Sequence, residues 1–312
     1  MALRATSYPP EGNIVRPTTV IEAPRLSTRL GTDVVICSET FQRSGSFKFR
    51  AAFNVATNVD HPMVVSASSG NFGQAMAFAC SLTKKSCTLV MPITSAKVKV
   101  DAVFEYGGQV EFVDVRVKTR EARVQELAKL HPEAYIASAY DDPFVIEGNS
   151  SLGMEIAKLR YAFDDVVVPI GGGGLSSGVI VGLRNLAKSV SVVGAEPLLG
   201  NDAARSLTAG ELLRCGSEPM TIADGARTLS LGRRNWEILR TGLRTIVEVP
   251  EEKIVEATRV LFHLANLKVE PTGALGVAAI LTQPALFRDR RVCCVVTGGN
   301  VDPALYSQIL AG

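Results

Sequence analysis

The sequence predicts an α/β fold built from open parallel sheets that are covered by helices. Along the 312 residues, short runs rich in Val and Ile alternate with longer segments that have the period of a helix. The Val- and Ile-rich runs are apolar throughout, which is typical of strands buried on both faces. With 46% hydrophobic and 21% charged residues, the composition is that of a globular protein with a large core.

Seven segments are predicted to be strands and five to be helices. The strands are the apolar runs at 33–37, 63–68, 87–92, 109–115, 166–170, 191–197 and 292–299. The helices are the periodic segments at 71–82, 96–106, 119–130, 175–187 and 252–267. Gly107 and Gly108 follow the second helix and predict its end, because glycine favours the backbone of a helix C-cap.

Charge and composition exclude several functional classes. The net charge of +2 is small and scattered, so a nucleic-acid partner is not expected. No segment approaches the roughly 20 apolar residues that span a bilayer, and the first residues lack the apolar stretch of a signal peptide. The six cysteines show no zinc-binding or CxxC spacing and are predicted to be buried, reduced thiols. We therefore expect a cytoplasmic protein with no membrane partner.

Four consecutive glycines, Gly171, Gly172, Gly173 and Gly174, stand between a predicted strand and a predicted helix. Open α/β sheets place their ligands at such strand ends. Glycine lets backbone N–H groups turn toward one point, and the helix N-terminus adds a partial charge that favours an anion. A phosphate group is the predicted ligand, and a tight turn without a ligand is the alternative. The spacing fits neither the G-x-G-x-x-G of a dinucleotide site nor a P-loop.

A second cluster of small polar residues, at 66–74, also joins a strand end to a helix start. Hydroxyl groups and free backbone N–H groups in this position suit a carboxylate, and an Asn amide can donate to a ring oxygen. The alternative is a helix cap that binds no ligand.

Lys48 stands between two phenylalanines, Phe47 and Phe49. Apolar neighbours remove water from an amine and lower its pKa toward the range in which the neutral amine is a nucleophile. The alternative is a surface lysine at a helix start, since most lysines keep their ammonium group in water. Taken by itself, this segment favours the alternative.

Together the three clusters resemble one family of enzymes. Residues 46–48 (SFK) resemble its S-F-K motif, residues 69–71 (SGN) its S-G-N motif, and residues 171–174 its tetraglycine loop. The family is that of the fold-type II pyridoxal 5'-phosphate (PLP) enzymes, which are similar in fold to tryptophan synthase β. The resemblance is strongest to the branch of threonine and serine dehydratases and serine racemase, and it extends from Pro17 to Asn300. Further segments agree in order and spacing: 39–42, 221–225, 270–273 and 297–300.

The resemblance implies a role for each motif. Lys48 would be joined covalently to the cofactor and then act as the base at the substrate Cα, with Phe47 beside it. The four glycines would hold the cofactor phosphate, Asn71 would bind the ring hydroxyl, and Thr297 would face the pyridine nitrogen. A hydroxyl group holds the pyridinium proton less firmly than a carboxylate does, so we expect a weaker electron sink than in aminotransferases. Elimination of a group from Cβ suits such a ring.

The substrate would lie against the second cluster, at Ser68, Ser69, Gly70, Asn71 and Phe72. Ser69 corresponds to the serine that acts in the racemases as the acid or base opposite the lysine, but dehydratases often carry a serine there as well. The family usually has His at the position of Phe72, and it commonly has AGQG at 147–150, where this chain has EGNS. Phe72 leads to the hypothesis that the substrate side chain is larger or more apolar than that of threonine.

A divalent-cation site of this branch matches the spacing of Glu196, Gly200 and Asp202. Two carboxylates and a backbone carbonyl are oxygen ligands, which suit Mg²⁺, Ca²⁺ or Mn²⁺. The alternative is a solvated acidic loop after a strand.

The predicted function is that of a PLP-dependent ammonia-lyase (a dehydratase). It would convert a β-hydroxy amino acid, such as threonine, serine or a 3-hydroxy analogue, to a 2-oxo acid and ammonia. The first alternative is an amino-acid racemase, such as a serine racemase, on the same scaffold. β-Replacement, as in cysteine synthase, is disfavoured by the segments at 223–225 and 270–273. A non-catalytic ligand-binding protein is disfavoured by the intact Lys48.

The resemblance also predicts the domain organisation. Residues 1–62 and 141–312 would form a large PLP-binding domain, and residues 63–140 a small mobile domain that closes over the substrate. The cofactor would lie between the two domains. A homodimer is expected from the resemblance alone.

Overall fold

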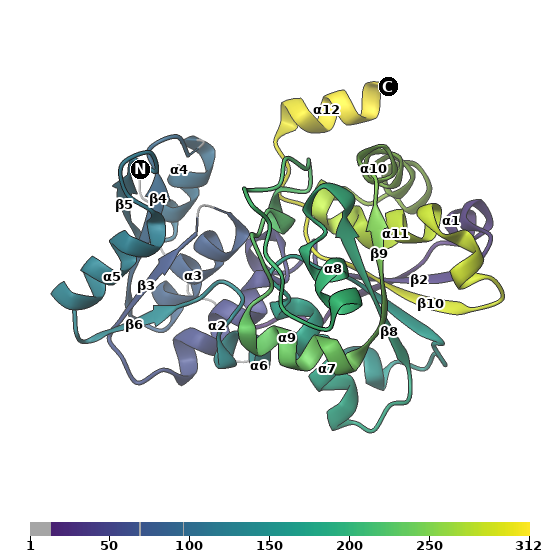
Figure 1. The fold of residues 1–312 in the computed structure, drawn as a ribbon, viewed down its shortest axis with the longest axis horizontal. Coiled ribbons are helices and arrows are strands. Elements are labelled where there is room, and N and C mark those ends of the chain that lie inside the picture. Colours follow the sequence, from purple (N-terminus) through teal and green to yellow (C-terminus); the bar gives the residue numbers. More distant parts are fainter. Residues whose placement is uncertain (1–13, 69, 96) are drawn as a thin grey trace.

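Two separate sheets with helices on both sides make up the fold (Figure 1). The structure, a computed structural model, describes residues 14–68, 70–95 and 97–312. The large sheet has six strands in the order β1-β2-β10-β7-β8-β9, and the small sheet has four in the order β5-β4-β3-β6. Strand β1 runs antiparallel to β2, and every other pair is parallel. The predicted fold of open parallel sheets covered by helices is confirmed.

All seven predicted strands are present, and the three strands that were not predicted lie at sheet edges. An edge strand is partly exposed, so it lacks the continuous apolar run of a central strand. The large sheet consists of β1 (Thr19–Glu22), β2 (Asp33–Ser38), β7 (Asp165–Pro169), β8 (Ser191–Pro197), β9 (Leu243–Val249) and β10 (Arg291–Val296). The small sheet consists of β3 (Met63–Ala67), β4 (Ser86–Pro92), β5 (Gln109–Val113) and β6 (Ala134–Ala137).

The five predicted helices are present, and the described residues form seven more. Some of the additional helices are buried on most sides and therefore lack an amphipathic period. Gly107 follows α4 with φ +81°, as the predicted C-cap requires. The helices are α1 (Pro24–Leu30), α2 (Lys48–Asn58), α3 (Asn71–Leu82), α4 (Lys97–Glu105), α5 (Arg120–Leu130), α6 (Pro143–Lys158), α7 (Gly174–Asn185), α8 (Asp202–Ala209), α9 (Arg233–Gly242), α10 (Glu251–Ala265), α11 (Pro271–Thr282) and α12 (Pro303–Ala311).

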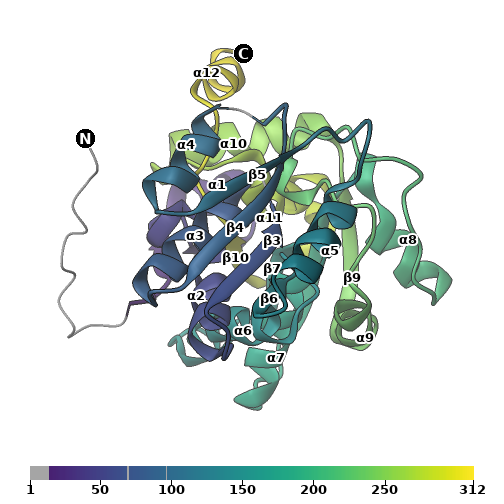
Figure 2. The same cartoon turned by 90° about the vertical axis from the view of Figure 1, so that its left-hand side faces the viewer.

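Helices cover both faces of each sheet. In the small sheet, which faces the viewer in Figure 2, Val64 packs toward α3, whereas Val65 packs with Val124 and Leu127 of α5. Successive strand residues point to opposite faces, so both faces become apolar. In the large sheet, α10 and α11 share a core with Val167, and α6, α7 and α9 share the opposite core with Val166. No helix in the described part of the chain is long and apolar enough to cross a membrane.

A buried arginine anchors helix α2, which begins at Lys48 and packs against α3 and α6. Arg50 Nε lies 2.7 Å from Glu39 Oε2, and its Nη1 lies 2.7 Å from Glu155 Oε1. The side chains of Arg50 and Glu39 are fully buried. Two carboxylates satisfy the planar guanidinium group, which makes burial of its charge tolerable. The start of α2 is therefore anchored to the large-sheet side of the molecule by Glu39 and Glu155.

Strands β3 to β6 form the small sheet, and all the other strands form the large sheet. Asn71, the four glycines and Thr297 follow the carboxyl ends of β3, β7 and β10, and Lys48 begins α2. The exact domain boundaries and the mobility of the small unit stay predictions.

Candidate active site

Lys48 lies between the two sheets. The preceding residue is tied to the end of β10, because the Phe47 amide donates to the Thr297 carbonyl at 2.9 Å. The Lys48 ammonium group donates to the carbonyl of Ala139, which follows β6 of the small sheet, at 3.1 Å. The amine thus reaches from the large-sheet side of the molecule toward the small sheet.

Two aromatic rings lie close to the Lys48 amine, and only one of them was expected. The ring centroids of Phe47 and Phe72 lie 4.9 and 5.8 Å from Nζ. Phe49 is instead fully buried in the core around α3, because consecutive residues of a helix point in different directions. Burial lowers the pKa of Lys48 from 10.5 to about 8, although the nearby Glu270 opposes this shift. The structure therefore provides the activated amine, with Phe72 taking the place expected of Phe49.

The glycine loop, residues 171–174, joins β7 to α7. In the described part of the chain, its four amides donate no hydrogen bond. Asn235 Nδ2 and the Gly232 amide donate to the Gly172 carbonyl at 2.7 and 3.0 Å and hold the turn. The ring of Tyr140 packs so closely on Gly172 that an added Cβ would overlap it. Free amides at the start of a helix form an anion site, so the loop fits the phosphate of a cofactor.

The second predicted cluster has two different functions. Ser68 Oγ accepts hydrogen bonds from the amides of Gly73 and Gly70 at 3.1 and 3.4 Å, so this residue, which precedes α3, supports the start of that helix. Asn71 instead reaches across the structure, and its Nδ2 donates to both carboxylate oxygens of Glu270 at 2.9 and 3.0 Å. Ser69 lies outside the described residues, and its role stays a prediction.

Thr297 follows β10 and carries a buried hydroxyl group with no partner. It is 1% exposed, and its Oγ1 makes no hydrogen bond within the described part of the chain. Ser46 Oγ, two residues before Lys48, is also buried and unpaired there. Buried hydroxyl groups normally have partners. The orphaned Thr297 Oγ1 therefore fits a ligand heteroatom, such as the pyridine nitrogen of PLP.

Glu270, Asn300 and Tyr140 also belong to the site, although they were given no role in the prediction. Glu270 is 3% exposed and precedes α11, and burial raises its pKa from 4.5 to about 8, although the Asn71 hydrogen bond opposes this shift. Asn300 Nδ2 donates to Asn71 Oδ1 at 2.9 Å. Glu270 and Asn300 stand in segments that match the family, so that match was the available signal. Tyr140 stands in none of the motifs.

The predicted metal ligands lie at the end of β8. Glu196 accepts hydrogen bonds from the Ala203 and Ala204 amides at 3.0 and 2.9 Å and so caps α8. Asp202 Oδ2 is buried without a partner among the described residues, and burial raises the pKa of Asp202 to about 6. The described chain contains no group of three or more His, Cys, Asp or Glu residues that could hold a metal ion. A site of two carboxylates and the Gly200 carbonyl stays a prediction.

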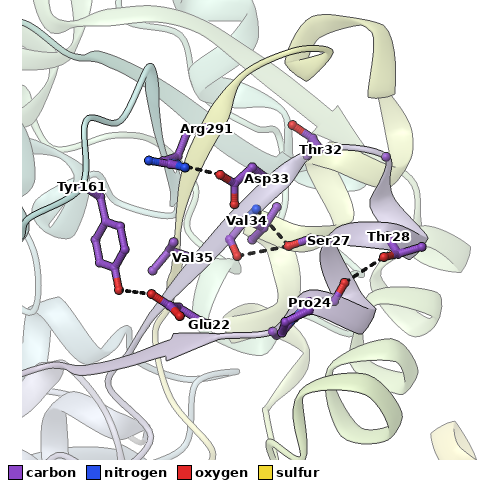
Figure 3. Close-up of a pocket in the computed structure, with 12 residues that line it drawn as sticks. Glu22, Pro24, Ser27, Thr28, Thr32, Asp33, Val34, Val35, Tyr161 and Arg291 are labelled. Carbon is purple, nitrogen blue, oxygen red and sulfur yellow. Dashed lines mark hydrogen bonds and ion pairs between the residues drawn. The ribbon is translucent and has the colours of Figure 1, made fainter.

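A surface pocket of about 610 Å³ lies between β1, α1 and β2 (Figure 3). Its charged side chains pair with one another or with a hydroxyl group: Asp33 binds Arg291, and Glu22 binds the Tyr161 hydroxyl group. None of the predicted site residues lines this pocket. We therefore assign the chemistry to the region around Lys48.

Parallel α/β sheets, an amine of lowered pKa, a free glycine loop and an orphaned hydroxyl group together define a PLP-dependent enzyme. The comparison with known families agrees, because the family described as "Pyridoxal-phosphate dependent enzyme" matches residues 13–298. The chain belongs to this family.

Known proteins resemble the chain over nearly its whole length. It is 38% identical over 299 residues to the L-threo-3-hydroxyaspartate ammonia-lyase of Pseudomonas sp, covering 95% of this chain and 93% of that protein. It is 34% identical to the serine racemase of Bos taurus, covering 91% and 88%. The crystal structure of the T.th. threonine deaminase matches with a TM-score of 0.85 and 35% identity over 92% of each chain.

These similarities confirm three predictions. The fold is that of the fold-type II PLP enzymes, the cofactor is PLP, and the enzyme class is a PLP-dependent lyase of the ammonia-lyase type. Serine racemase, the predicted alternative, is matched less well.

Proposed function

We propose that the protein converts a β-hydroxy amino acid to a 2-oxo acid and ammonia, with 3-hydroxyaspartate as the first substrate to test. The observation that carries this proposal is the Lys48 amine, with its pKa lowered to about 8 and the rings of Phe47 and Phe72 close by. The name of the Pseudomonas relative supports a substrate with a second carboxylate. Such a side chain is larger than that of threonine, as Phe72 suggested, but it is polar.

PLP, when bound, supplies an aldehyde that condenses with amines and a ring that stabilises negative charge at Cα. The free amides of the glycine loop would hold its phosphate, while Asn71 and Thr297 would hold the polar atoms of the ring. The neutral Lys48 amine would take the proton from Cα. The hydroxyl group would leave Cβ as water, and hydrolysis of the product would release ammonia. Phe47 and Phe72 would keep water away from Lys48.

A racemase is the second candidate, supported by the similarity to the serine racemase of Bos taurus. Inversion at Cα needs a proton donor on the face opposite Lys48, and Ser69 is proposed for this role. The two reactions can occur in one site, because both begin with loss of the same proton. The ratio of elimination to racemisation therefore has to be measured for each substrate.

The test is a turnover assay on purified holoenzyme with the stereoisomers of serine, threonine and 3-hydroxyaspartate. We expect ammonia and the matching 2-oxo acid in equal amounts, and no turnover by Lys48→Ala. Lys85, which also donates to backbone carbonyls (of Val59 and His61), belongs to no motif, so Lys85→Arg should remain active. Enantiomer interconversion without ammonia release would identify a racemase instead.

Four further features are proposed, and all except the cytoplasmic location rest on the family resemblance. We propose a divalent cation, Mg²⁺, Ca²⁺ or Mn²⁺, at Glu196, Gly200 and Asp202. We also propose a homodimer, which sedimentation of the purified protein would test, and a cytoplasmic location. The small unit at 63–140 is proposed to move relative to the rest.

A further inference from the structure

A chain of polar side chains runs from the backbone of Ser44 to Glu270, beside Lys48. Asn300 Nδ2 donates to the Ser44 carbonyl at 2.7 Å and to Asn71 Oδ1 at 2.9 Å. Asn71 Nδ2 then donates to the two Glu270 oxygens at 2.9 and 3.0 Å. This chain connects the start of α3, on the small-sheet side, with the start of α11, on the large-sheet side.

This row of hydrogen bonds fixes which way the Asn71 amide points. The Ser44 carbonyl can only accept, so the group of Asn300 that faces it must be the NH₂. That NH₂ also faces Asn71, so Asn71 must present its carbonyl oxygen to Asn300 and its own NH₂ to Glu270. A flipped Asn71 would place two NH₂ groups against each other. Glu270 is thus the acceptor at the end of this row of hydrogen bonds.

Glu270 has little freedom to move. It is 3% exposed, and its backbone amide donates to the Gly298 carbonyl at 3.1 Å. A Cβ at Gly298 would lie 2.7 Å from Glu270 Oε1, so only glycine leaves room for the carboxyl group. The carboxyl group is therefore clamped between Asn71 and the segment that follows Thr297.

We propose that Glu270 is a positioning residue of the reaction: it holds the Asn71 amide in place for the cofactor ring and keeps a proton beside Lys48. This inference rests on the proposed function. Both parts follow from one buried carboxyl group, which accepts hydrogen bonds from Asn71 and opposes the lowering of the Lys48 pKa.

Burial of Glu270 supports a protonated carboxyl group. Burial raises its pKa to about 8 and Asp224 of the short helix at 224–226 adds to the rise, whereas Asn71, Lys99 of α4 and Lys48 of α2 oppose it. Covalent use of the Lys48 amine changes the charge that this residue presents to Glu270. Gln has nearly the shape of a neutral carboxyl group but cannot gain or lose a proton in this pH range. Glu270→Gln therefore keeps the shape of the side chain and removes its titration.

The test compares Glu270→Ala and Glu270→Gln with the unaltered protein in two measurements. The first is the PLP affinity of apoprotein, followed by absorbance. We expect Glu270→Ala to bind PLP at least about tenfold more weakly and Glu270→Gln less than about fivefold more weakly. The second is the pH titration of the holoenzyme absorption band. We expect a transition near pH 8 in the unaltered protein that is lost or moved by more than about one unit in Glu270→Gln.

Glu251→Gln is the matched control, because Glu251 accepts its hydrogen bonds from the Thr221 hydroxyl group and the Ile222 amide instead. It should leave both measurements unchanged. Unaltered PLP affinity in Glu270→Ala, or an unaltered titration in Glu270→Gln, would overturn the inference while the proposed function stands. If the unaltered protein itself released no ammonia, the proposed function would fail first.

Discussion

At the scale of single residues, Phe72 controls the environment of the reactive amine. Its ring lies 5.8 Å from Lys48 Nζ, and the residue is 2% exposed. Phe72→Leu should admit water to Lys48 and raise its pKa from about 8 toward the ordinary value of 10.5. Only the neutral amine reacts with an aldehyde, so the midpoint of the pH dependence should move to higher pH. The measurement is the rate of PLP uptake by apoprotein across a pH series.

Phe53→Leu serves as the control for this change. Phe53 stacks on Phe49 against the same core, with centroids 5.7 Å apart, so Phe53→Leu makes the same change of side chain without touching the surroundings of Lys48. We expect each to lose about 1 kcal/mol of stability, but only Phe72→Leu to move the midpoint. Equal midpoints in all three proteins would mean that Phe72 does not desolvate the amine.

The sequence allowed prediction of the residues that stand within short motifs, but not of the partners that the fold brings to them. The four glycines were found because they join a strand to a helix, whereas Lys48 and Thr297 were assigned through the motifs that resemble the family. Glu270 meets Asn71 across 199 positions, and no local pattern records such a contact. The wrong choice of Phe49 has a similar cause, since a neighbour in sequence is not a neighbour in a helix. The roles of Ser68, Ser69 and Gly70 stay predictions.

At the scale of elements, the turn between β7 and α7 depends on the absence of a side chain at Gly172. The ring of Tyr140 occupies the place where a Cβ would lie. Gly172→Ala should displace Tyr140 or the turn, costing about 1–3 kcal/mol of stability. It should also misalign the amides, so we expect PLP affinity to fall at least about tenfold. Denaturant unfolding and PLP titration of apoprotein measure the two effects.

Gly216→Ala provides the comparison, because a Cβ at Gly216 would meet no atom within 4 Å. Both its stability and its PLP affinity should match those of the unaltered protein. A Gly172→Ala protein that bound PLP normally would show that the phosphate does not rest on this turn.

Central strands were predictable because burial on both faces demands a continuous apolar run. The edge strands β1, β6 and β9 are not buried in this way, need no continuous apolar run and were missed. Helix α11 was missed for the opposite reason, since ten of its twelve residues are buried and no polar face marks its period. Elements with one exposed face, such as α5 and α10, were found.

At the scale of the whole molecule, one ion pair joins the two sheet units close to the site. Lys99 of α4 lies 3.1 Å from Asp224, and both influence the pKa of Glu270. The two side chains are 37% and 46% exposed, so their attraction contributes no more than about 1 kcal/mol and is screened by salt. A contact this weak can restrain the small unit and still open during turnover.

Lys99→Ala should therefore raise the hydrogen exchange of backbone amides along the facing edge of the small unit by up to about fivefold at low salt, corresponding to loss of roughly 1 kcal/mol. In roughly 1 M salt the variant and the unaltered protein should exchange alike, because screening removes the pair in both. The charge-swapped double variant Lys99→Asp with Asp224→Lys restores the attraction and should recover the slow exchange at low salt. If the swap left exchange as fast as in Lys99→Ala, the ion pair would not restrain the small unit, and the packing of α2 against α3 together with the Asn71–Glu270 hydrogen bonds would hold the units together.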